Sequence, residues 1–110
     1  MANLADFVFL DANSTSTTSN TFYVPYGADE VVLQVKKSGS PDITVQGKTD
    51  RDNGDWVNMA VIGRSDFNLA EKITANGIFS VDACGIREMR VVSGGSAGDT
   101  AVFGSAVGEG

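Results

Sequence analysis

The residues best suited to acid–base chemistry are three aspartates in the stretch TDRDNGD: Asp50, Asp52 and Asp55. Two carboxyl groups can hydrolyse a glycoside when they flank a sugar cleft about 5–10 Å apart and one has a raised pKa. Three aspartates in an exposed turn instead repel one another and stay ionised. The chain also has no histidine, which removes the commonest general base and every Ser-His-Asp or Cys-His arrangement. We therefore expect no enzymatic activity and no catalytic residue.

The same stretch is the best candidate for a metal site. Residues 50–55, DRDNGD, are similar to the start of a calcium-binding loop, D-x-[DN]-x-[DN]-G. However, glycine occupies the fifth place instead of the sixth, and the twelfth place, which requires a bidentate glutamate, is Val61. Asp, Asn and Gly are also the usual residues of a tight turn. We predict a turn without metal or cofactor, with calcium binding by Asp50, Asp52 and Asp55 as the alternative.

Aromatic side chains are the candidates for binding a partner. Trp56, the single tryptophan, alternates with Val57 and Met59 and so faces the opposite side of its strand. With Tyr23 and Tyr26 it would form an aromatic platform for a sugar ring or a protein. A lone tryptophan also commonly covers a hairpin end or fills a second layer of packing, and we favour this interpretation. Glycan binding is therefore a secondary expectation.

Composition narrows the classes of protein. A chain of 110 residues accommodates one domain, and its 42% hydrophobic and 20% charged residues exclude disorder. Eight basic against fourteen acidic residues give a net charge of −6, which argues against nucleic acid as a partner. The sequence has no cluster of basic residues and no apolar stretch of about 20 residues, so we expect no membrane association either.

The elements that would position these side chains are short strands. Residues 43–62, ITVQGKTDRDNGDWVNMAVI, predict a hairpin because apolar and polar residues alternate on both sides of the turn. Turn residues recur about every ten positions, which is typical of hairpin-linked strands. This pattern predicts an all-β fold, an antiparallel β-sandwich or jelly roll of about eight strands. The other candidate strands are residues 6–10, 22–27, 31–36, 69–74 (or a short helix), 78–83, 86–93 and 100–107.

The N-terminal region predicts an arm. Residues 13–21, NSTSTTSNT, have the polar low complexity of a linker, and residues 6–10, DFVFL, form a short apolar run. We therefore divide the chain into an extended arm, residues 1–21, and a β-sandwich domain, residues 22–110. Side chains of the arm and of the nearby strands would contact a partner: Phe7, Phe9, Leu10, Phe22, Tyr23, Tyr26 and Trp56.

The strand pattern over about residues 31–106 resembles small β-sandwich proteins of tailed-phage virions. In that family a strand ending in V-x-G precedes an Asp/Asn turn and a tryptophan. A G-x-[YF]-x-V strand is then followed by one ending in x-R-V, and by a final G-x-x-x-V-x-G strand. The corresponding residues here are Val45, Gly47, Asp50, Trp56, Gly77, Phe79, Val81, Arg90, Val91, Gly98, Val102 and Gly104.

The resemblance implies a virion structural protein without catalytic activity, and such domains are often homotrimers. We expect a capsid decoration (cement) protein, made in the host cytoplasm, that binds the major capsid protein on the outer surface of a phage head. A protein that binds only the assembled shell stabilises that shell by mass action. The alternative is a carbohydrate- or receptor-binding module of a phage tail or head fibre, which would use Trp56 and the acidic turn.

Overall fold

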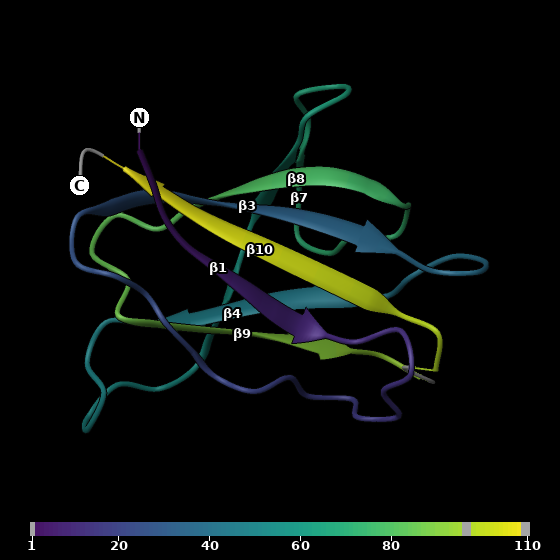
Figure 1. The fold of residues 1–110 in the computed structure, drawn as a ribbon, viewed down its shortest axis with the longest axis horizontal. Coiled ribbons are helices and arrows are strands. Elements are labelled where there is room, and N and C mark those ends of the chain that lie inside the picture. Colours follow the sequence, from purple (N-terminus) through teal and green to yellow (C-terminus); the bar gives the residue numbers. More distant parts are fainter. Residues whose placement is uncertain (1, 96–97, 109–110) are drawn as a thin grey trace.

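The computed structural model describes residues 2–95 and 98–108, which form a sandwich of two antiparallel sheets (Figure 1). The all-β prediction is confirmed, with ten strands instead of about eight. The larger sheet has the strand order β1-β10-β3-β8-β6-β7, and the smaller sheet has the order β2-β9-β4-β5. The strands are β1 (Ala2–Leu10), β2 (Phe22–Tyr23), β3 (Ala28–Lys36), β4 (Ile43–Lys48), β5 (Val57–Met59), β6 (Val61–Gly63), β7 (Leu69–Ala70), β8 (Gly77–Asp82), β9 (Glu88–Ser93) and β10 (Ala101–Gly108).

Between the sheets lies a core built from every second side chain of the long strands. β3 buries Val31, Leu33 and Val35, while the residues between them face outward. Full burial of one such side chain contributes about 1.5–3 kcal/mol to folding. In the described part of the chain no helix occurs that is long and apolar enough to cross a membrane.

The predicted central hairpin forms, but its second strand is divided between the two sheets. β4 pairs with β5 from Val45–Met59 to Gly47–Val57, as the alternation predicts. The next pairing position, beside Ile43, is occupied by Ile73, whose backbone exchanges two hydrogen bonds with Ile43. The chain therefore leaves the smaller sheet at Ala60 and continues as β6 of the larger sheet.

Residues 69–74 adopt the extended alternative rather than the helical one. Leu69 and Ala70 form β7, which pairs with β6, and Ile73 forms the bridge to Ile43. Ile73 is fully buried because this bridge places it under the edge of the smaller sheet.

The expected N-terminal arm is instead part of the sandwich. β1 is the edge strand of the larger sheet and pairs with β10 along its length, from Ala2–Gly108 to Leu10–Val102. Residues 17–19 then run along β9: Ser93 donates its backbone N–H to Thr17, and Ser19 donates to Val91. Backbone pairing with β10 and β9 therefore ties the segment to its own domain. Residue 1 and residues 109–110, the outer ends of the two predicted regions, lie outside the described residues.

Candidate binding surfaces

Three of the side chains predicted to bind a partner lie in the core. Phe9, Leu10 and Phe22 are buried, because a bulge between Val8 and Leu10 turns two successive residues of β1 inward. The rings of Phe7, Phe9 and Phe22 form one cluster with centroids 4.9–5.8 Å apart. Phe9, Leu10 and Phe22 stabilise the sandwich and are not available to a partner in the folded chain, whereas Phe7 is half-buried and keeps part of its surface exposed.

The aromatic cluster has space only because β10 carries a glycine beside it. A Cβ atom on Gly104 would lie 2.6 Å from Phe9 Cε2 and 3.3 Å from Leu33 Cδ2. Gly104 therefore lets the ring of Phe9 pack close to the backbone of β10, which explains a glycine in the middle of a long strand.

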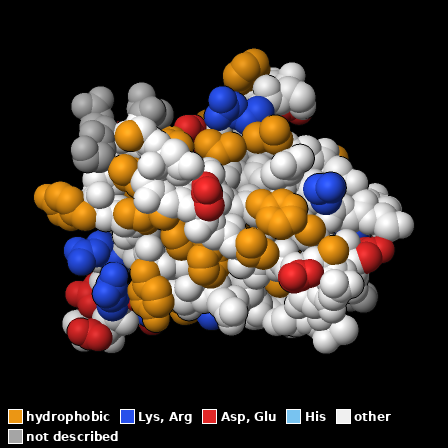
Figure 2. Space-filling view, in the orientation of Figure 1, with side chains coloured by type: hydrophobic (Ala, Val, Ile, Leu, Met, Phe, Trp, Pro, Cys, Tyr) orange, Lys and Arg blue, Asp and Glu red, His pale blue; other side chains and the backbone are white. Residues whose placement is uncertain are grey.

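The surface most suited to contact another protein is the outer face of the larger sheet. Exposed hydrophobic side chains from neighbouring strands lie on this side, with polar and charged groups among them (Figure 2). Ser80, which accepts a hydrogen bond from Arg64, separates Val32 from Ile62. The pairing register places Val8 beside Phe103, and Gln34 between Phe103 and Ile78. We call this surface the apolar face; its residues are Val8, Val32, Ile62, Leu69, Ile78 and Phe103.

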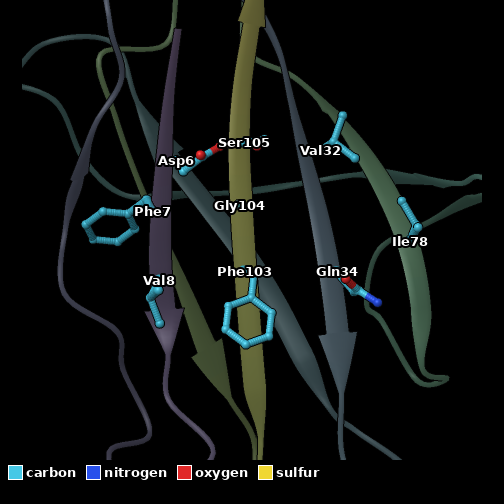
Figure 3. Close-up of a pocket in the computed structure, with 9 residues that line it drawn as sticks. All are labelled: Asp6, Phe7, Val8, Val32, Gln34, Ile78, Phe103, Gly104 and Ser105. Atoms are coloured by element: carbon cyan, nitrogen blue, oxygen red, sulfur yellow. Dashed lines mark hydrogen bonds between the residues drawn. The ribbon is translucent and has the colours of Figure 1, made fainter. Parts of the chain in front are cut away.

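A shallow hollow of about 450 Å³ lies in the middle of the apolar face (Figure 3). Val8, Val32, Ile78 and Phe103 line most of it, and Ser105 with Asp6 forms its polar end. Ser105 donates its hydroxyl proton to Asp6, and this hydrogen bond, together with one from Asn3, lowers the pKa of Asp6. The hollow is therefore apolar along four strands, β1, β10, β3 and β8, and carries a negative charge at one end.

Apart from Val8, which lies in the predicted arm, no residue of the apolar face was predicted to bind a partner. In β10 the sequence AVFGSAV has hydrophobic residues at both even and odd positions, so either face of the strand could be the buried one. Burial of Val102 and Ala106 leaves Phe103 on the outside with 41% of its surface exposed. A sequence signal for the apolar face does exist: in a two-layer fold only one face of a strand is buried. A strand with apolar residues on both faces must therefore expose some of them.

Trp56 lies over the outer face of the smaller sheet, half-buried by charged side chains. The Arg90 guanidinium lies 4.3 Å from its ring centroid, and Lys48 Nζ lies 4.9 Å from it. Arg90 also donates to Gln46, which donates to Asn58. This arrangement matches the packing interpretation of Trp56, since its ring is a surface on which the protein's own cations stack.

Below Trp56, the two sheet strands β4 and β9 hold a buried ion pair. Lys48 Nζ lies 3.6 Å from Glu88 Oε2, and both side chains are largely covered. Glu88 Oε2 has no hydrogen-bond donor among the described residues. The positive charge of Lys48 therefore compensates the buried negative charge of Glu88.

The acidic stretch forms the predicted turn. Asp50 Oδ1 accepts hydrogen bonds from the backbone N–H groups of Asn53 and Asp52, at 3.0 and 2.9 Å. These bonds, with Arg87 nearby as a weaker cause, lower the pKa of Asp50. Across the described residues, no group of three or more Cys, Asp or Glu side chains is arranged to hold a metal ion. Asp50 acts here as the residue that closes the turn.

Tyr23 and Tyr26 are the predicted binding residues that do lie on the surface. Tyr23 is 59% exposed and lies under the guanidinium of Arg51, at 5.0 Å from ring centroid to Cζ. Tyr26 is fully exposed, in the turn between β2 and β3. The structure thus brings Tyr23 and Tyr26 near one end of the sandwich and places the apolar face elsewhere.

Comparison with known proteins finds likeness in structure rather than in sequence. No family model and no curated protein matches the chain. Among solved structures, the SPBc2 prophage-derived protein YomS is 21% identical with a TM-score of 0.78, over 93% of this chain and 90% of that protein. The PBSX exported protein XepA is 19% identical with a TM-score of 0.81, over 93% of this chain. The chain corresponds to 37% of the length of XepA. The protein therefore has the fold of two phage-derived proteins, one matched over most of its length and one matched over a single part.

Proposed function

We propose that this protein is a non-enzymatic structural protein of a phage virion, and specifically a decoration protein that binds the major capsid protein on the outer surface of the head. The observation that carries the proposal is the apolar face, which exposes large hydrophobic side chains on neighbouring strands. Exposed apolar patches of this kind mark surfaces that bind other proteins. The fold of two phage-derived proteins supports a phage origin.

The proposed binding surface replaces the N-terminal arm of the sequence prediction. Val8, Ile78 and Phe103 provide the apolar contact, because three of the side chains first assigned to the partner are buried in the core. The charge of Asp6 at the end of the hollow would select a basic or hydrogen-bonding group on the capsid protein. We further propose that the decoration unit is a homotrimer, as the resemblance implies.

The first experiment is the copy number of this chain in purified virions, by quantitative mass spectrometry against the major capsid protein. Decoration predicts hundreds of copies in a simple ratio to the capsid protein. A handful of copies per particle would assign the chain to the tail or baseplate, and no copies would overturn the virion assignment. Sedimentation velocity tests the trimer, which should have three times the 11.5 kDa mass of the chain.

Surface variants then test which face binds. Phe103→Asp should abolish co-sedimentation with capsids that lack the protein, because a carboxylate placed in an apolar interface loses its hydration. The matched control is Val57→Asp, which makes the same kind of change at a residue of the smaller sheet that is 61% exposed. Equal binding by both variants and the unmodified protein would show that the apolar face is not the contact surface.

A further inference from the structure

A second cleft lies at the end of the sandwich where three loops meet. It is formed by residues 24–29 before and at the start of β3, by the β4–β5 loop, and by the β8–β9 loop. Its volume is about 420 Å³, within the roughly 300–1,000 Å³ typical of ligand sites. It shares no residue with the apolar face, so it could be occupied while that face is bound to another protein.

Tyr26 is the most unusual residue of this cleft. Its side chain is completely exposed at the rim, although an aromatic ring of this size is normally at least partly covered. The turn is held by the Ala28 N–H bonded to the Pro25 carbonyl and by Gly27 in a left-handed conformation, φ 89°. The ring of Tyr26 is therefore presented on a defined turn as a flat, free surface on which a ligand can stack.

The polar side chains of the cleft combine donors and acceptors. Arg51 and Arg87 provide guanidinium N–H donors, and Asp29 provides carboxylate acceptors. None of these three side chains belongs to an ion pair found within the described residues. The Arg51 guanidinium also lies over the ring of Tyr23, but this contact does not use its N–H donors. The three groups can therefore bond to a ligand that both accepts and donates hydrogen bonds.

The charges around the cleft nearly cancel. Arg51 and Arg87 also line the adjoining depression of the β4–β5 loop, where Asp50 and Asp52 lie beside them. Attraction to Arg87 contributes to the low pKa of Asp50, so the arginine is partly neutralised by its own loop. A ligand with a strong net charge of either sign gains little here, whereas a neutral polyhydroxyl compound can bond to both kinds of group.

We propose that this cleft binds a neutral saccharide. The apolar face of a sugar ring stacks on Tyr26, neighbouring hydroxyl groups accept hydrogen bonds from Arg51 and Arg87, and a hydroxyl donates to Asp29. The site differs from a platform on Trp56, since the ring of Trp56 is already used by Arg90 and Lys48. It does not depend on the decoration role.

The test is a titration of the ¹⁵N-labelled full chain with a panel of neutral oligosaccharides built from glucose, galactose, mannose and fucose. At least one should shift the backbone amide signals of Gly27, Thr49 and Gly85 at concentrations below about 10 mM. Tyr26→Ala and Arg87→Gln should each weaken binding by about tenfold or more. Tyr26→Phe, which keeps the ring, should bind like the unmodified protein.

The control variant is Arg64→Gln, the same change of charge outside the cleft, directly after β6, where Arg64 bonds to Ser80 and lies near Glu30. It should leave saccharide binding unchanged. Cys84 gives a second measurement, because it is exposed and lines the cleft. A bound saccharide should slow its reaction with a thiol reagent, and Tyr26→Ala should remove that protection.

Three results would overturn the proposal. The first is that no saccharide of the panel binds. The second is that Tyr26→Ala binds as tightly as the unmodified chain, which would place the ligand elsewhere. The third is that an oligouronate or inorganic phosphate binds more tightly than every neutral sugar, which would make the site an anion site. Each result is independent of the copy number in virions.

Discussion

At the scale of single residues, we expect replacement of Lys48 to lower the free energy of unfolding strongly. Lys48 lies beside the buried Glu88 carboxylate and over the ring of Trp56. Lys48→Met should lower the free energy of unfolding by about 3–5 kcal/mol, because removing one partner of a buried pair leaves an uncompensated charge. Urea denaturation followed by Trp56 fluorescence measures the change.

The double variant Lys48→Met/Glu88→Leu separates this effect from loss of packing. It removes both charges, so its stability should be well above that of Lys48→Met alone. If the double variant were as unstable as the single one, the ion pair would not be the cause.

Asp50 should make the acidic turn sensitive to pH. Its pKa in the folded chain lies below the ordinary value of 3.8, mainly because backbone N–H groups of Asn53 and Asp52 bond to the carboxylate. A depressed pKa means that the contribution to stability is fully present above pH 4 and is lost as the pH falls through the folded-state pKa. The amide signals of Asp52 and Asn53 should therefore move at a pH below 3.8, and Asp50→Asn should remove that titration while leaving the turn formed.

Among the elements, β1 differs most from its prediction: the sequence predicted part of an extended arm, and the structure shows a strand paired with β10. Deleting residues 2–10 should unfold the protein, because it removes Phe9 and Leu10 from the core and exposes the edge of β10. Circular dichroism should show loss of the cooperative thermal transition. The matched control is Val8→Thr on the exposed side of the same strand, which should keep the transition. A folded deletion variant would restore the division into arm and sandwich.

Most elements could be predicted because their signals are local. The alternation in residues 43–48 and the Asp-Asn-Gly turn suffice to define the β4–β5 hairpin, and Pro25 confines β2 to two residues. The change of sheet at Ala60 could not be predicted, since it depends on Ile73 occupying the edge of β4 from thirty positions away in the sequence. Similarly, nothing local to residues 6–10 reveals the bulge that buries both Phe9 and Leu10.

For the whole molecule, the binding surfaces were the least predictable feature. Hydrophobicity identifies the side chains that leave water, but it does not say whether a sheet or a partner covers them. Phe9 and Phe103 are chemically identical, and only the pairing of β1 with β10 sends one inward and the other outward. Tyr23 and Tyr26 do lie on the surface, but their binding of a partner stays a prediction, since exposure alone does not identify a contact.

Because the chain crosses between the layers at Ala60, the two sheets should unfold together. The two sheets share one hydrophobic core, so unfolding of either sheet would expose the buried side chains of the other. We therefore expect a single two-state transition. Trp56 fluorescence reports on the smaller sheet, and circular dichroism reports on both. The two midpoints in urea should coincide, whereas an earlier fluorescence transition would show that the smaller sheet opens on its own.

The pairing of Ala2 with Gly108 places the first and last described residues side by side at one corner (Figure 1). Interstrand hydrogen bonds of an antiparallel pair run perpendicular to the strands. A tensile force that separates the two ends therefore acts along these bonds and breaks them one after another, beginning at Ala2. A sandwich pulled by its two ends would therefore open at low force. A sandwich bound to a surface through the face of its larger sheet would instead distribute the force over several strands at once.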